Sequence, residues 1–142
     1  MATKTLGKKG GELVQSFESF DYCFVSGTLD NTHSAAITLD PVGQIVKLVS
    51  TQWSFVLAAD AANVIGLVVQ GPKINELASS AETTDKYLIL ALGPAVVNED
   101  VIATTDIAGS AITLATVKTA LGALAPKILF VADPAKTTEG TA

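Results

Sequence analysis

The chain has 142 residues, a length suited to one domain. Hydrophobic residues make up 49% and charged residues 16%, a mixture that excludes intrinsic disorder, which needs low hydrophobicity and high net charge. All nine basic residues are lysine against fourteen acids, so the net charge of −5 argues against nucleic-acid binding. A surface this poor in charge also predicts that a partner covers part of it.

Cysteine and histidine each occur once, as Cys23 and His33. We therefore expect no internal disulfide, no metal site built on several thiolates or imidazoles, and no cofactor. The polar, lysine-bearing start of the chain does not have the apolar core of a signal peptide. No stretch approaches the ~18 consecutive apolar residues of a membrane span. The sequence thus predicts a protein made without secretion and without a membrane partner.

The first eleven residues contain Lys4, Lys8 and Lys9 and no acid, whereas all fourteen acids follow them. Three glycines add flexibility, and no periodic apolar face is present. We predict that residues 1–16 form a flexible arm. Such a segment is either a frayed terminus or an arm that becomes ordered against an acidic partner surface.

Aromatic residues cluster after this arm, at Phe17, Phe20, Tyr22 and Phe24. The last three alternate with Asp21 and Cys23, which is the period of a β-strand with one aromatic face. This strand belongs either to the core or to an anchor that docks on another chain, since aromatic residues are enriched in interface hot spots. The four aromatic residues and the three arm lysines are the partner-binding candidates.

From residue 35 onward, period-two apolar runs separated by Gly, Pro, Asn and Asp predict a series of short strands. They cover residues 37–39, 44–50, 53–57, 64–69, 86–92 (the most buried), 95–98 and 127–131. One short helix is predicted at about 114–121, with Thr113 or Thr116 as N-cap and Gly122 as its stop. The fold class is mainly β, a small single-domain sandwich or barrel-like fold over residues 17–132, followed by a loose tail at 133–142.

Catalytic chemistry finds little support in these residues. A serine or cysteine nucleophile would have to use His33 as its base, and no Gly-x-Ser-x-Gly elbow is present. A hydrolase that uses acids among Asp60, Glu99, Asp100 and Asp106 stays as one alternative. A β-barrel that binds a small apolar ligand between Trp53, Phe55 and aliphatic strands is another. We predict a protein that is not an enzyme and has no small-molecule substrate.

One family resemblance is carried by residues 86–100, where a buried strand runs into Gly-Pro-Ala-Val-Val-Asn and an acidic turn. This segment resembles the head decoration proteins of tailed phages, the lambda-type capsid-stabilising family. Residues 58–69 look like that family's Asp/Ala-rich turn and Gly-containing strand, and residues 116–131 like its closing helix and strand. The aromatic stretch at 17–24 and the arm do not match the family closely, and the tail looks longer.

The resemblance implies a mainly-β protein that forms homotrimers on the outer surface of the capsid, in the virion. It also implies an amino terminus that becomes ordered against the major capsid protein, often by adding a strand. Such a role needs a compact body, apolar faces for neighbouring copies and an arm that can pair with a sheet edge. We therefore expect a capsid decoration, or cement, protein that binds the expanded head, and another virion component such as a tail protein is the alternative.

Overall fold

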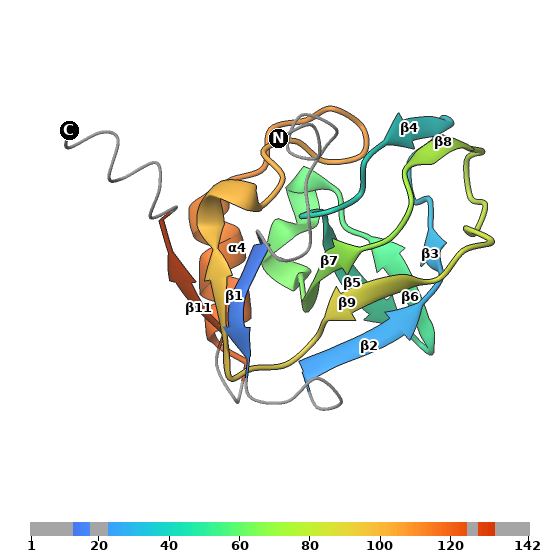
Figure 1. Cartoon of the computed structure of the whole chain (residues 1–142). Helices are drawn as coiled ribbons and strands as arrows, with labels where there is room; N and C mark the ends of the chain where they lie inside the picture. Colours follow the sequence, from blue (N-terminus) through green and yellow to red (C-terminus); the bar gives the residue numbers. More distant parts are fainter. Residues whose placement is uncertain (1–12, 18–22, 125–127, 133–142) are drawn as a thin grey trace, which may run out of the picture.

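The strands of the computed structural model form three sheets around one short α-helix (Figure 1). The structure describes residues 13–17, 23–124 and 128–132. Within these residues the fold is mainly β with a single α-helix, as the sequence predicts. None of the helices in this part of the chain is long and apolar enough to cross a membrane.

The large sheet has six strands and forms the centre of the molecule. In spatial order they are β2 (Phe24–Gly27), β9 (Tyr87–Leu90), β7 (Gly66–Gln70), β5 (Ile45–Val49), β6 (Gln52–Phe55) and β3 (Leu29–Asp30). The first and last of these strands, β2 and β3, are separated in the sequence only by Thr28. The sheet must therefore curl so that its two ends approach each other, although its strands do not close into a barrel.

Two smaller sheets flank the large one. The terminal sheet contains β1 (Val14–Phe17), β10 (Ala95–Asn98) and β11 (Ile128–Val131), in that order. The second small sheet pairs β4 (Ile37–Leu39) antiparallel with β8 (Ile74–Leu77). We call this two-stranded sheet the hairpin sheet, although its strands are not consecutive in the sequence. Figure 1 shows the terminal sheet at the left of the molecule and the hairpin sheet, with β3, at the right.

Helix α4 (Leu114–Gly122) packs between the terminal sheet and the 3₁₀ segment η1 (Ala58–Asn63). Its Val117 and Leu121, four residues apart, are fully buried and give it one apolar face. The predicted N-cap position, Thr113, is the N-cap, although its side chain makes no capping hydrogen bond. A second 3₁₀ segment, η2 (Glu99–Val101), follows β10 directly.

The large sheet separates two apolar clusters, one on each face. Paired positions such as Phe24, Leu67 and Leu90 face the terminal sheet and α4, whereas Ile89 and Phe55 face the hairpin sheet. Strand β9 contributes Tyr87, Ile89 and Leu90 at 2% exposure or less, so the strand predicted at residues 86–92 is deeply buried. It is not the most buried strand, because Gly66 to Val69 of β7 are all buried whereas Leu88 of β9 is half-buried.

Three local differences from the sequence analysis have clear causes. Residues 14–16, assigned to the arm, lie in β1, because Val14 pairs with Val97 of β10 and buries its side chain there. Strand β8 was missed, because its two apolar residues, Ile74 and Leu77, are three positions apart and show no period-two alternation. The stretch from Phe17 to Phe24 is not one strand, because Phe17 ends β1 and Phe24 begins β2, in different sheets.

Candidate interaction surface

The terminal sheet has one buried and one exposed face. Parallel pairing of β10 with β11 places Ala95 beside Ile128 and Val97 beside Phe130, and these side chains point toward the core. The alternate positions point outward, where Leu129 is 58% exposed and Val131 is 39% exposed. Their neighbours on β10 are less exposed, since Val96, beside Leu129, is half-buried and Asn98, beside Val131, is 4% exposed. An apolar row therefore runs along the outer face of a strand that lies at the edge of the sheet.

The inner side of β11 is held by α4. The Nζ of Lys118 lies 6.0 Å from the centroid of the Phe130 ring and 3.0 Å from the Oε1 of Glu99. This places a cation over an aromatic face and pairs it with an acid of η2. The contact joins α4, β11 and η2, and so fixes which side of β11 faces the core.

Two of the predicted partner-binding aromatic residues lie in the described part of the chain. Phe17 is 46% exposed, whereas Phe24 is 7% exposed and belongs to the core. Their ring centroids are 4.9 Å apart with an interplanar angle of 85°, an edge-to-face contact that joins the terminal sheet to the large sheet. Phe17 therefore remains a candidate for contact with a partner. The prediction that Phe24 binds a partner is wrong, because Phe24 is a core residue that packs against Phe17.

The other partner-binding candidates lie outside the described residues. They are Lys4, Lys8, Lys9, Phe20 and Tyr22. Residues 1–12 join the described structure immediately before β1. The terminal sheet is therefore the point at which the lysine-bearing segment is attached.

Two of the four acids considered for a hydrolase, Asp106 and Glu99, have structural partners. Asp106 is 5% exposed, and its carboxylate accepts hydrogen bonds from the backbone N–H groups of Ala58, Ala108 and Ser110 at 2.7, 2.9 and 2.9 Å. Glu99 pairs with Lys118. In the described ranges, no group of three or more His, Cys, Asp and Glu side chains is arranged to hold a metal ion. The Asp106 carboxylate organises the loop that follows η2.

The aromatic residues considered for a ligand-binding barrel are core residues. Phe55 is 1% exposed and Trp53 is 9% exposed, and both pack in the cluster on the hairpin-sheet side of the large sheet. The Trp53 ring lies so close to Gly27 that an added Cβ there would be 2.9 Å from its Cδ1. The Trp53 ring therefore packs directly against the backbone of β2, and both aromatic side chains are part of the core.

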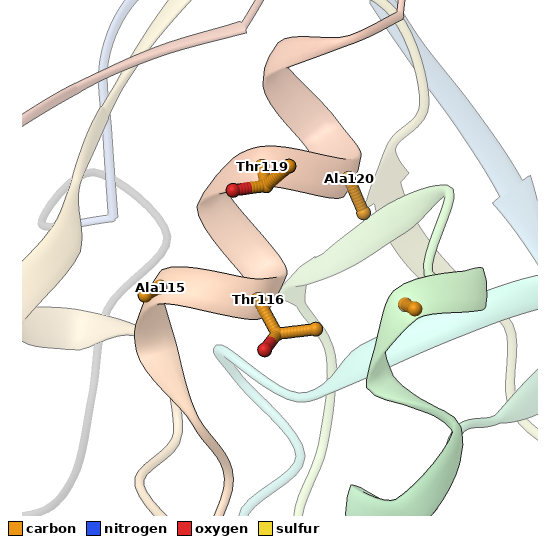
Figure 2. Close-up of a pocket in the computed structure, with 5 residues that line it drawn as sticks. Ala115, Thr116, Thr119 and Ala120 are labelled. Carbon is orange, nitrogen blue, oxygen red and sulfur yellow. The ribbon is translucent and has the colours of Figure 1, made fainter.

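A shallow groove of about 310 Å³ lies between η1 and α4. Figure 2 shows the four α4 side chains that line it, Ala115, Thr116, Thr119 and Ala120. Ala62 of η1 lines its other side. These side chains are small and none is titratable, so the groove has neither an acid–base group nor a charged ligand anchor.

Acidic side chains gather at the opposite end from the terminal sheet. Asp30 of β3 forms a bridge pair with Glu82, and Thr28 donates a side-chain hydrogen bond to the Glu82 carboxylate. Burial raises the pKa of Asp30, and the nearby Glu82 charge raises it further. Burial also raises the pKa of Tyr87, to which the charges of Asp85 and Asp40 add.

Comparisons with protein-family models, with curated proteins and with solved structures found no match to this chain. The surface candidates that the sequence analysis missed are Leu129 and Val131. Their strand is apolar on both faces, so no period-two pattern distinguishes an exposed side from a buried one. A signal that could have helped is the sequence of β11 itself, because Ile128–Val131 has no charged residue or proline to protect an edge strand.

Proposed function

We propose that this chain is a structural protein that decorates the outer surface of a tailed-phage head and stabilises contacts between major capsid protein subunits, without catalytic activity of its own. The observation that carries this proposal is the terminal sheet. It exposes Leu129 and Val131 on its outer face and Phe17 on its β1 edge, and β1 is also where the lysine-bearing segment 1–12 is attached. Exposed apolar side chains beside such a segment are typical of a docking surface.

The position of β1 supports a binding mode. Among the described strands β1 lies at one edge of the terminal sheet, paired only with β10. Residues 1–12 extend from its start and, if fully stretched, span up to about 40 Å. A segment of that reach can pair with a sheet edge of a neighbouring protein, where backbone hydrogen bonds supply the affinity and little is asked of its sequence.

The resemblance of residues 86–100 to head decoration proteins supports the choice of partner. In the fold these residues include β9 of the large sheet, β10 of the terminal sheet, the segment that joins the two strands, and the start of η2. Many weak, identical attachments on a symmetric shell add to strong binding through effective concentration. Binding of the expanded shell alone then stabilises that state by mass action.

The test is co-sedimentation with heads of the virus that encodes the chain, in expanded and unexpanded form. The full chain is expected to sediment with expanded heads. A chain that lacks residues 2–12 keeps β1 and is expected to stay folded, with an unchanged circular dichroism spectrum, and to remain in the supernatant. A chain that lacks residues 134–142 is the matched control and is expected to sediment like the full chain.

Two results would contradict the proposal at different points. Absence of the full chain from the pellet with either form of head would overturn the function. Undiminished sedimentation of the chain without residues 2–12 would overturn the role of the arm and leave the terminal sheet itself as the capsid contact.

A further inference from the structure

A polar pocket of about 330 Å³ lies between the β4–β5 connection and the loop that follows η2. Asp40 and Gln44 line it from the connection, and Thr105 and Asp106 line it from the loop. Figure 1 shows β4 and this loop, in orange, at the top of the molecule, whereas the terminal sheet lies at the left. The pocket is therefore a feature separate from the exposed face of the terminal sheet.

Gln44 places an unpartnered acceptor at the wall of this pocket. Its side chain is 5% exposed, and its Nε2 donates a hydrogen bond to the Thr105 carbonyl oxygen at 2.9 Å. This bond fixes which end of the amide is the oxygen, because two acceptor oxygens would repel each other. The Oε1 of Gln44 is buried and has no hydrogen-bond donor among the described residues. A buried acceptor without a donor is costly, so this oxygen points to a donor that binds in the pocket.

The charge of the pocket favours a cationic donor. Asp40 is half-buried and Asp106 is 5% exposed, and the described residues that line the pocket include no lysine or histidine. The Oδ1 of Asp40 accepts a hydrogen bond from the Val42 N–H at 3.2 Å. Each carboxylate oxygen has about two acceptor positions, so the three backbone N–H groups bound to Asp106 leave room for a further donor. Two carboxylates and one amide oxygen are thus available to a group with positive charge and several N–H donors.

A guanidinium group fits these acceptors better than an ammonium group or a metal ion. Its five N–H donors lie in one plane and point in several directions, so they can reach acceptors on both walls of a pocket. It is also less strongly hydrated than an ammonium group and gives up water more easily at a buried acceptor. A calcium ion needs about six to eight oxygen ligands. The described residues provide no group of three or more His, Cys, Asp and Glu that could hold a metal ion.

We propose that this pocket binds the guanidinium group of an arginine on a partner protein. The Oε1 of Gln44 is the buried acceptor, and the carboxylates of Asp40 and Asp106 supply the opposite charge. The chain contains no arginine, so neither its own residues nor a second copy of it can provide the group. The identity of the partner rests on the proposed function, in which the partner is the major capsid protein.

Titration of the isotope-labelled full chain with N-acetyl-arginine amide, followed by NMR, tests the pocket without any capsid. We expect shifts centred on the Gln44 side-chain amide and on the backbone amides of Thr105 and Asp106, with a millimolar Kd. N-acetyl-citrulline amide has nearly the same shape without the charge and is expected to cause no shifts. N-acetyl-lysine amide is expected to bind about fivefold more weakly than the arginine probe, because its ammonium group cannot reach acceptors on both walls.

Two variants test the assigned contacts in the same titration. Asp40→Asn removes a charge, while its amide oxygen can still accept from the Val42 N–H, and it is expected to weaken binding of the arginine probe about tenfold. Gln44→Leu removes the buried acceptor and is expected to weaken binding by a similar factor. Gln44→Leu also removes the bond to Thr105, so Asp40→Asn decides the test if that variant does not fold.

The matched control is Asp85→Asn, which removes the same charge from an exposed acid that lines a different polar pocket. It is expected to leave the Kd of the arginine probe unchanged. The site would be overturned by an absence of shifts at Gln44, by equal binding of the lysine probe, or by equal effects of Asp40→Asn and Asp85→Asn. Calcium chloride that shifts the same signals at lower concentration than the arginine probe would also overturn it, in favour of a metal site.

Co-sedimentation with expanded heads tests the source of the arginine. Asp40→Asn is expected to sediment about tenfold more weakly than the full chain, and Asp85→Asn is expected to sediment like it. Undiminished sedimentation of Asp40→Asn would overturn the major capsid protein as the source of the arginine. Failure of the unchanged chain to sediment would overturn the proposed function, whereas shifts at Gln44 with the arginine probe would still support the pocket as a guanidinium site.

Discussion

The Phe55 side of the large sheet and the outer face of the terminal sheet are built from the same kinds of residue, yet the first is buried and the second is exposed. The difference lies in what covers each face. On the Phe55 side, Ile37, Ile74 and Leu77 of the hairpin sheet pack against the large sheet and form one buried cluster with it. No described element covers Leu129 and Val131. Composition therefore indicates a face that needs covering, and topology decides whether the chain covers it itself.

The covered face should tolerate change least, and Gly71 offers the sharpest test. A Cβ at this position would lie 2.9 Å from the ring Cγ of Tyr87 and closer still to two other ring carbons. Tyr87 cannot move easily, because it is 2% exposed and its hydroxyl donates a hydrogen bond to the Pro72 carbonyl at 2.8 Å. We expect Gly71→Ala to lower the free energy of unfolding by about 3 kcal/mol, measured by denaturant titration.

Gly109→Ala is the matched control for this substitution. Gly109 has a φ of +86°, but an added Cβ there meets no atom within 4 Å. Gly109→Ala should therefore lower the free energy of unfolding only through backbone strain at this φ angle, by about 1 kcal/mol. A loss at Gly71 no larger than the loss at Gly109 would show that the Tyr87 ring does not pack as described.

A substitution of Asp106 tests the loop after η2, whose Ile107 packs in the cluster on the Phe55 side of the large sheet. Its Oδ1 accepts from Ala108 and Ser110 and its Oδ2 accepts from Ala58. In Asp106→Asn the amide oxygen can replace only one of the two oxygens, so a buried N–H faces another donor. We expect this substitution to lower the free energy of unfolding by about 2 kcal/mol, measured by thermal or denaturant unfolding.

Asp60→Asn is the comparison for that loss, since Asp60 is exposed on η1. It should change the free energy of unfolding by no more than about 0.5 kcal/mol. Equal effects of the two substitutions would mean that the three backbone hydrogen bonds of Asp106 contribute nothing measurable.

Much of the covered region could be predicted from sequence, and the physical reason is local. Strands β5, β6, β7 and β9 have β-branched or alternating apolar residues between Gly, Pro, Asn or Asp, and helix α4 has its apolar residues three and four apart. These signals depend on the period of the element itself. The helix was placed within one residue of its observed end for that reason.

The candidate surface was harder to predict, because it depends on pairing between distant residues. Phe17 and Phe24 looked like one strand, but β10 pairs with the first and β9 with the second, and neither partner is visible in the local pattern. Likewise, Phe130 faces the core and Leu129 faces outward because α4 packs on one side of β11. An all-apolar strand does not indicate which side that will be.

Neighbouring residues of β11 give a direct test of this assignment. Ile128 is 1% exposed and Leu129 is 58% exposed. We expect Ile128→Ala to lower the free energy of unfolding of the dilute protein by about 3 kcal/mol, because it leaves a cavity. Leu129→Ser should lower it by no more than about 0.5 kcal/mol. Equal losses in denaturant titrations would mean that the exposed face is buried within one chain.

The smallest expected effect concerns the acidic end and its pH dependence. The pKa of Asp30 is raised in the folded protein above 3.8, first by burial and then by the Glu82 charge. As the pH rises from 3.8 through that raised pKa, the unfolded chain loses its proton first, so the free energy of unfolding falls. Asp30→Asn should therefore stabilise the protein at pH 7 by no more than about 0.5 kcal/mol, because water screens a partly exposed carboxyl group.

Comparison of two variants across pH separates the causes of this shift. Near pH 3 the gain from Asp30→Asn should vanish, because the aspartate is then protonated in both states. Glu82→Gln can still accept the Thr28 hydrogen bond but removes the charge, so it should remove only the part of the pH dependence caused by repulsion. A gain from Asp30→Asn that is the same at pH 3 and pH 7 would show that the side-chain shape, and not its charge, sets the stability of this end of the molecule.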